Sequence, residues 1–308
     1  MQNEGKLTLG LAMSGSGNRT SFYVGFLEET DAAGLKFDYL SACSGGSLVA
    51  AAYACGGLSQ LKAFMMDFNS EKLKSLIKRT SLKNGGLFSL DLAEEELLKI
   101  TKGKTFEEVS PKMSFAAVDI ESGELVYLCM GDIARAALIS CTLPGIFEAV
   151  KWGERTLVDG GLLVMVPSQP IKLAKVDVCV GINMRGTRHI FTEGQMTLKK
   201  AFNFFKKILL IEYLENLFEY LFLDKEADIS KHPHFFTVLG KSMDLAIKAS
   251  KNESTQQPEC DLLITPEMPK LKNKEFDHAS VMEYYELGKK TAREYAPKIK
   301  EILKQKSR

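Results

Sequence analysis

The sequence carries almost no net charge, because 40 lysine and arginine residues are balanced by 39 aspartate and glutamate residues, which leaves a formal charge of +1. Proteins that bind nucleic acids need a clustered basic excess to neutralise phosphates. We therefore expect no nucleic-acid partner. With 308 residues, of which 45% are hydrophobic and 26% charged, the chain has the composition of a globular protein.

The amino terminus lacks the features of a secretory signal. The stretch from Met1 to Lys6 has neither a basic start nor a long apolar core followed by small residues for cleavage. We therefore expect a cytoplasmic protein.

The sequence also lacks the cysteine spacings that mark zinc sites and disulfide frameworks. Its six cysteines lie far apart, never form a C-x-x-C pair and stand mostly in apolar runs. They are Cys43, Cys55, Cys129, Cys141, Cys179 and Cys260. We interpret them as buried free thiols, and we expect neither a metal ion nor an organic cofactor.

The order of the predicted elements is typical of a parallel α/β sheet. A strand, a glycine-rich loop and a helix are followed by a second strand and helix. We expect strands near residues 7–13, 37–42, 113–119, 124–129, 156–158 and 175–183, and helices near 20–33, 48–55, 133–140 and from 280, with 58–108 mainly helical. This order predicts a single α/β domain over residues 1–308, with a central, mostly parallel sheet and helices on both faces.

Ser44 stands where a strand-turn-helix nucleophile would be, between a short apolar stretch and an alanine-rich one. In a nucleophile elbow the serine lies at a sharp turn, and small residues two places before and after it prevent clashes. Ala42 and Gly46 occupy those places. We predict Ser44 as the nucleophile; Cys43, one place off this pattern, is the alternative.

The loop from Gly15 through Ser16 and Gly17 to Arg19 lies between a predicted strand and helix. Such a turn presents backbone N–H groups to a negative charge, either a phosphate or a developing oxyanion. A dinucleotide-binding loop needs a third glycine where Thr20 stands, although Asp38 could be its ribose-binding acid. A tight turn without a ligand is a further alternative; we favour an oxyanion hole.

Asp159 ends a predicted strand and is followed by Gly160 and Gly161, so that its carboxylate can lie at an open turn on the same sheet edge as Ser44. The four histidines, at 189, 232, 234 and 278, stand in no evident motif. An α/β-hydrolase triad is disfavoured, because the 43 residues before Ser44 leave room for only about two strands. We therefore predict a Ser44–Asp159 dyad; the alternative is that Asp159 merely begins a β-turn.

Together these motifs resemble the patatin-like phospholipases, whose pattern combines a G-G-G-x-R/K-G loop, G-x-S-x-G and a later D-G-G/A. Here the three motifs appear in order at residues 15–20, 42–46 and 159–161. Stretches 116–124, 140–147 and 260–266 look like the same family. The similarity covers roughly residues 7–180 and 235–296.

The resemblance implies a three-layer α/β/α fold and a bacterial-type lipid acyl hydrolase, of the phospholipase A or lysophospholipase type, that cleaves carboxylic esters through an acyl-enzyme. It implies Ser44 as nucleophile, Asp159 as its base, oxyanion donors at Gly15, Ser16 and Gly17, and Arg19 as a contact of the loop or of a lipid head group. Ser16, Thr20 and Ala42 replace glycines of the pattern and restrict the backbone. A catalytically weak or inactive lipid-binding protein with the same fold is therefore the alternative.

We expect a helical insertion or lid at about residues 186–233. Within it, the apolar segment 197–223 is interrupted too often by lysines and glutamates to span a membrane. Three interpretations stay open: a core helix, a lid or lipid-binding helix that makes peripheral contact with a membrane, and a dimer contact.

Overall fold

The computed structural model describes residues 7–68, 70–80, 85–184, 238, 240–242, 245, 258–269 and 278–307. The chain divides into one unit made of Met1–Met184 and Pro233–Arg308 and a second made of Arg185–His232. The second unit lies outside the described residues, and so does the segment 197–223. The sheet, helices and site described below all belong to the first unit.

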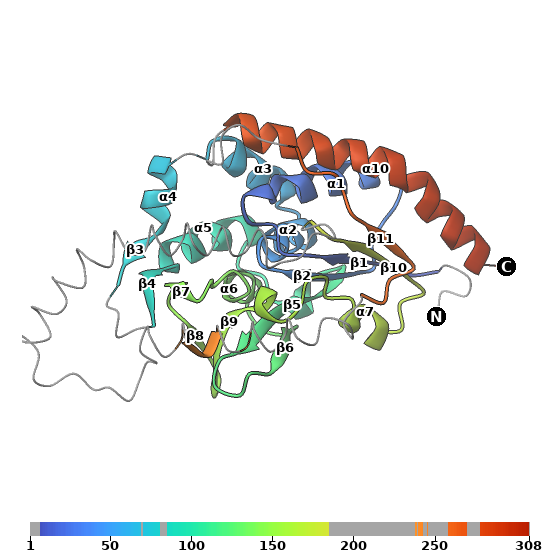
Figure 1. Cartoon of the computed structure of the whole chain (residues 1–308). Coiled ribbons are helices and arrows are strands. Elements are labelled where there is room, and N and C mark those ends of the chain that lie inside the picture. Colours follow the sequence, from blue (N-terminus) through green and yellow to red (C-terminus); the bar gives the residue numbers. More distant parts are fainter. Residues whose placement is uncertain are drawn as a thin grey trace, which may run out of the picture. The chain divides into compact units, whose positions relative to one another are not determined.

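The described residues form a central sheet of eight strands in the order β11-β10-β1-β2-β5-β9-β8, with β6 also paired to β5 (Figure 1). The strands are β1 (Leu9–Met13), β2 (Tyr39–Cys43), β5 (Lys112–Asp119), β6 (Leu125–Leu128), β8 (Val150–Trp152), β9 (Arg155–Asp159), β10 (Val178–Ile182) and β11 (Leu262–Ile264). The five strands from β11 to β5 are parallel, whereas β6, β9 and β8 are antiparallel additions. The expected mostly parallel sheet is confirmed.

Helices cover both faces of this sheet (Figure 1). They are α1 (Ser21–Ala32), α2 (Gly45–Ala54), α3 (Leu58–Met66), α4 (Ser70–Leu76), α5 (Asp91–Thr101), α6 (Ile133–Ile139), α7 (Gln169–Leu173) and α10 (His278–Lys306), with short 3₁₀ turns at Gly17–Arg19, Phe106–Glu108 and Gly160–Leu162. In β1, Leu11 and Met13 belong to the large core cluster shared with α1 and α10, whereas Ala12 packs with Ile171 of α7. This alternation is the period of a strand buried on both faces, and it gives the three-layer α/β/α fold.

Helices α1 and α10 cross at two glycines. A β-carbon at Gly25 would lie 2.1 Å from the Tyr285 carbonyl oxygen, and one at Gly288 would lie 2.0 Å from the Phe22 carbonyl oxygen. Both clashes are with backbone, so neither could be relieved by moving a side chain. The absence of side chains at these positions therefore sets how closely the two helices pack.

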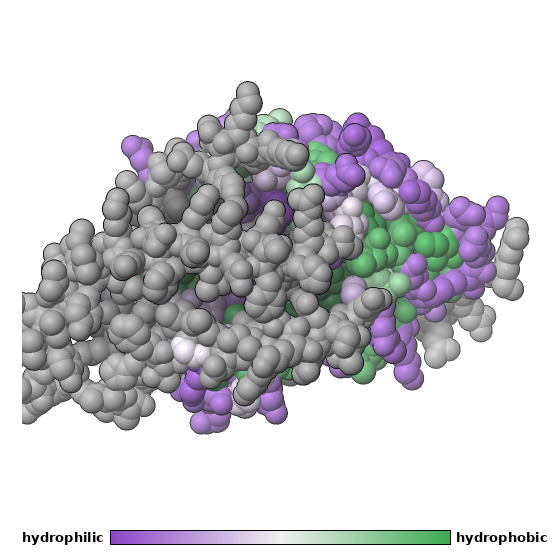
Figure 2. All heavy atoms as spheres, viewed as in Figure 1, coloured by the Kyte–Doolittle hydropathy of each residue, from purple (hydrophilic) through white to green (hydrophobic). Residues whose placement is uncertain are grey.

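The outward surface of α10 is hydrophilic, and a hydrophobic area adjoins it where Figure 1 places β11 (Figure 2). Leu263 of β11 contributes to exposed apolar surface, with 41% of its area accessible. The amphipathic character of α10 follows from its single buried face, which includes Val281, Tyr284 and Ala292.

Two local features differ from the predictions. The range 58–108 is mainly helical, as expected, but it also contains strands β3 (Lys78–Arg79) and β4 (Gly86–Ser89), because β4 pairs with β7 (Gly145–Phe147) in a small second sheet. A partner so distant in sequence leaves no local signal. Helix α2 begins at Gly45, directly after Ser44, and not at Leu48.

Replacing Gly288 by alanine should destabilise the protein, because the added methyl group must push α10 away from α1. We expect a loss of about 1–3 kcal/mol in the free energy of unfolding, the usual cost of overpacking, measured by chemical denaturation. The matched control is Lys300→Ala on an exposed part of the same helix, which should change stability by less than about 0.5 kcal/mol. Equal stability of the two variants would contradict the close crossing.

Candidate active site

Ser44 occupies a strained turn between β2 and α2. Its backbone angles are φ 51° and ψ −132°, in a region that residues with a side chain rarely adopt. Gly46, two places after Ser44, has little room for a side chain, since a β-carbon there would lie 3.1 Å from the Ser14 carbonyl oxygen. Ala42, two places before, is fully buried, so its methyl group is accommodated. The predicted elbow geometry is present at Ser44, which is itself half-buried.

The glycine-rich loop lies beside this serine. Met13 of β1 pairs with Ala42 of β2 in a parallel register, so the loop after β1 and Ser44 after β2 emerge at the same sheet edge. A β-carbon at Gly15 would lie 3.3 Å from the Ser44 β-carbon and 4.0 Å from its Oγ. Gly17 has φ 56°, which favours glycine. The structure thus brings the predicted oxyanion loop within contact distance of the predicted nucleophile.

Two residues that replace glycines of the family pattern are bonded to each other. The hydroxyl oxygens of Ser16 and Thr20 are 2.8 Å apart, and the Thr20 hydroxyl also donates to the Gly17 carbonyl oxygen at 2.7 Å. Both hydroxyls lie against Gly45, where a β-carbon would be 2.4 Å from each. The pair therefore fills the space over the first residue of α2 and ties the two ends of the loop together.

Arg19 fastens the loop to the sheet. Its guanidinium donates to the Met184 carbonyl oxygen at 2.8 Å, just beyond β10, and to the Ser16 carbonyl oxygen at 3.3 Å. These contacts correspond to the first of the two roles considered for Arg19, that of holding the loop.

Asp159 lies on the other side of β5 from Ser44. In the sheet, Cys43 is opposite Ala116 and Asp159 is opposite Ala117, so β5 separates the ends of β2 and β9. The Asp159 side chain is 2% exposed, and its Oδ1 accepts a hydrogen bond from the Gly161 N–H at 2.7 Å. The Cys43 thiol donates to the same oxygen at 3.7 Å. A β-carbon at Gly160 would lie 2.6 Å from the Ala116 backbone, which explains the glycine after Asp159.

Sequence reasoning missed Cys141 as part of this site. Removal of its thiol from water and the nearby Asp159 carboxylate raise the pKa of Cys141, whereas a hydrogen bond from the Ser44 side chain lowers it. Cys141 is therefore close to both members of the predicted dyad. The stretch 140–147 was noted only as similar to the family, and a single cysteine in it carries no further signal.

Asp38 is not near the glycine loop. Its carboxylate accepts the Leu9 N–H at 2.8 Å, at the amino end of β1, whereas the loop follows the carboxyl end. Five residues of strand separate the two, or about 16 Å. The alternative in which Asp38 is the ribose acid of a dinucleotide site is therefore wrong.

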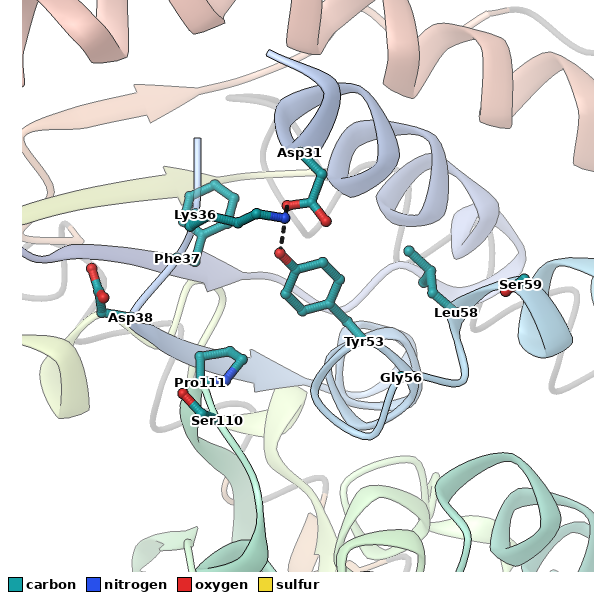
Figure 3. A pocket seen from close by; sticks show the side chains of 10 residues that line it. All are labelled: Asp31, Lys36, Phe37, Asp38, Tyr53, Gly56, Leu58, Ser59, Ser110 and Pro111. Carbon is teal, nitrogen blue, oxygen red and sulfur yellow. Dashed lines mark hydrogen bonds and ion pairs between the residues drawn. The ribbon is translucent and has the colours of Figure 1, made fainter. Parts of the chain in front are cut away.

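A cavity of about 530 Å³ opens at this amino end of the sheet (Figure 3). It is lined by residues that include Asp31, Lys36, Asp38 and Tyr53. Asp31 accepts a hydrogen bond from the Tyr53 hydroxyl at 2.6 Å and pairs with the Lys36 ammonium at 3.0 Å. Three of its polar groups thus bind one another, and the cavity lies at the far end of β2 from Ser44.

Among the described residues, no helix combines the length and the apolar character needed to cross a membrane. Within the same ranges, no three histidine, cysteine, aspartate or glutamate side chains gather as they would around a metal ion.

The comparisons with known proteins point to one family. A family model described as Patatin-like phospholipase matches residues 11–170. An uncharacterized NTE family protein of Mycobacterium tuberculosis is 29% identical over 185 residues, which cover 57% of this chain but 30% of that protein. The uncharacterized protein YqhO of Bacillus subtilis is 27% identical over 184 residues, covering 50% of this chain and 63% of YqhO. This chain therefore matches less than two thirds of the length of either relative.

Solved structures also resemble this chain, and the one named here does so at a low level. The crystal structure of VipD from Legionella pneumophila superimposes with a TM-score of 0.46 and 13% sequence identity, covering 96% of this chain and 67% of that one.

All six cysteines are described, and none is joined in a disulfide. Cys43, Cys55 and Cys179 are buried as predicted, Cys141 and Cys260 are partly exposed, and Cys129 is exposed after the end of β6. The expectation of buried thiols is therefore wrong for Cys129, because β6 ends at Leu128.

Iodoacetamide at pH 8 should modify Cys129 first in the folded protein and Cys55 and Cys43 last. Burial raises the pKa of Cys55 to about 11, so about one thiol in a thousand is ionised at that pH. Peptide mass spectrometry over time gives the order, with the protein unfolded in guanidinium as the control in which the differences should largely disappear. Rapid modification of the fully buried Cys43 would favour it as the nucleophile over Ser44.

Proposed function

The chain belongs to the patatin-like phospholipase family, and we propose that it is a serine hydrolase that cleaves the carboxylic ester bonds of lipids. The observation that carries this proposal is the strained turn at Ser44, a non-glycine residue at φ 51°. Such strain persists only where the surroundings enforce it, and it clusters at active sites. A glycine loop on one side and a buried carboxylate on the other supply the remaining chemical groups.

In the proposed reaction, the Ser44 Oγ attacks the ester carbonyl carbon while the Asp159 carboxylate accepts the hydroxyl proton. The carbonyl oxygen becomes an oxyanion that backbone N–H groups of Gly15, Ser16 and Gly17 stabilise. The C–O bond to the alcohol then breaks, the proton passes to the leaving oxygen, and an acyl-enzyme remains. Water then attacks the acyl carbon while the same carboxylate accepts its proton. The bond from the acyl carbon to Ser44 Oγ breaks, the proton passes to that oxygen, and the fatty acid leaves with the serine restored.

Neither group suffices alone. A single oxyanion donor is typically worth about 10²- to 10³-fold in rate, and a positioned base about 10²- to 10⁴-fold. The near-complete burial of Asp159 supports its use as a base, because exclusion of water strengthens its interaction with a nearby hydroxyl. Of the four histidines, His278 is described, and its ring contacts the Met66 carbonyl oxygen at the end of α3.

Ser44→Ala and Asp159→Asn should each abolish ester hydrolysis in a folded protein. Asparagine keeps an oxygen that can accept the Gly161 N–H but loses the negative charge, so it tests the base separately from the loop geometry. A fluorophosphonate probe followed by peptide mass spectrometry should label Ser44 in the wild-type protein, and hydrolysis of p-nitrophenyl esters of increasing chain length should fall by at least about 10²-fold in either variant.

The melting temperature of each variant is the control for folding. Full hydrolysis by Ser44→Ala would exclude this serine as the nucleophile. A wild-type protein that binds lipid vesicles but is not labelled would instead favour the second candidate, a noncatalytic lipid-binding protein, which the replacement of two loop glycines by Ser16 and Thr20 motivates.

The hydroxyl pair in the loop predicts a non-additive pair of mutations. Thr20→Ala removes both the bond to Ser16 and the bond to Gly17, whereas Ser16→Ala removes only the shared one. Each neutral bond is worth about 0.5–1.5 kcal/mol, so we expect rates of Ser44 labelling to fall about 2- to 10-fold. The double variant should be no slower than Thr20→Ala alone. If the labelling rate of the double variant fell by the product of the two single-variant factors, the two side chains would act independently.

A further inference from the structure

Ser140 lies at the end of α6, is fully buried, and makes three hydrogen bonds through one oxygen atom. Its Oγ accepts the Ser44 N–H at 2.9 Å and the Ser47 hydroxyl at 3.1 Å, and it donates to the Ala116 carbonyl oxygen at 2.6 Å. The three partners belong to the nucleophile turn, to α2 and to β5.

The directions of these bonds follow from the chemistry of a hydroxyl group. It has one hydrogen to donate and two lone pairs to accept with. A main-chain carbonyl only accepts and a main-chain N–H only donates, so the hydrogen of Ser140 goes to Ala116, and its lone pairs receive Ser44 and Ser47. Every bond that this hydroxyl can make is made.

The next two residues contact the rest of the dyad. The Cys141 thiol lies near the Ser44 side chain, which lowers the pKa of that thiol, and the Thr142 carbonyl oxygen accepts the Asp159 N–H at 2.9 Å. Ser140 therefore contacts the main chain of Ser44, Thr142 contacts the main chain of Asp159, and Cys141 lies between them.

We propose that Ser140 is a positioning residue for the hydrolysis, holding the Ser44 main chain in its strained turn and, through residues 141 and 142, setting the separation of Ser44 from Asp159. This inference rests on the proposed function. The Ser140 oxygen also occupies the Ser44 N–H. That amide is therefore not available to the oxyanion, which the glycine loop has to stabilise.

Ser47 provides a matched control. Its side chain is equally buried and belongs to the same network, because it donates to the Ser140 oxygen. It bonds to Ser140 and not to the main-chain N–H of Ser44, so Ser47→Ala removes a buried hydroxyl of the same size while leaving the bond from Ser140 to Ser44 in place.

The experiment compares Ser140→Ala with Ser47→Ala. We expect Ser140→Ala to lower kcat about 10- to 100-fold, the usual effect of a small misplacement of reacting groups, with KM changed less than about twofold. Fluorophosphonate labelling of Ser44 should slow by the same factor. Ser47→Ala should keep both rates within about threefold of wild type, with a similar change in melting temperature. Equal loss of rate in the two variants would overturn the positioning role and show a structural one.

Hydrogen exchange separates this proposal from the proposed function. The Ser44 amide should exchange at least about tenfold faster in Ser140→Ala than in Ser47→Ala, whether or not the protein hydrolyses esters. An unlabelled wild-type protein would reject the hydrolase alone, whereas unchanged Ser44 exchange in Ser140→Ala would reject the positioning bond. If Ser140→Ala does not fold, Ser140→Cys replaces it, because a thiol is a weaker donor and acceptor than a hydroxyl. We then expect smaller losses of kcat and labelling rate and a smaller increase in Ser44 amide exchange than for Ser140→Ala. Wild-type rates in Ser140→Cys would overturn the proposal.

Discussion

A serine at φ 51° and ψ −132° would relax to an ordinary turn if its neighbours allowed it. Holding it there costs about 1–3 kcal/mol, and interactions of the neighbouring elements with this turn offset that strain. Strand β2 before it is paired on both sides, by β1 and β5. Helix α2 begins at the next residue, and the hydroxyl of Ser140 receives the serine N–H. Release of any of these constraints would let the hydroxyl turn away from the loop beside it.

The middle of β5 is where the parts of the site meet. Cys43 and Asp159 lie on opposite sides of Ala116 and Ala117, and the Ala116 carbonyl oxygen receives the Ser140 hydroxyl. Glycine at 160 is required by this crowding, since a β-carbon there would meet the Ala116 backbone. Because β9 adds to β5 in the antiparallel direction, an aspartate from more than a hundred residues away lies one strand from β2, where its carboxylate accepts a hydrogen bond from the Cys43 thiol.

Sequence patterns were sufficient to predict those parts of the site that form recognisable local motifs. The positive φ of Gly17 and the bond from the Gly161 N–H to the Asp159 side chain are local features of this kind. The motifs also predicted Gly15, Gly46 and Gly160, although the crowding that requires glycine there comes from Ser44, Ser14 and Ala116. Ser140 was not predicted, because a serine at the end of a helix is ordinary and its role depends on partners in three other elements. Strands β3 and β4 were missed for the same reason. Asp38 was considered as a ribose-binding acid because of its spacing from the glycine loop, but that spacing does not tell at which end of the sheet a residue lies.

The sequence by itself determined the strand-helix-strand-helix order that leads through Ser44, the family and the candidate nucleophile, since side-chain volume, glycine freedom and apolar periodicity act over short distances. Only the tertiary structure decided that the Ser16 and Thr20 hydroxyls bond across Gly45, that Arg19 holds the loop to the end of β10, and that residues 140–142 touch both Ser44 and Asp159. The reason is that these contacts join segments whose proximity is created by sheet register and helix packing, and no local preference encodes them.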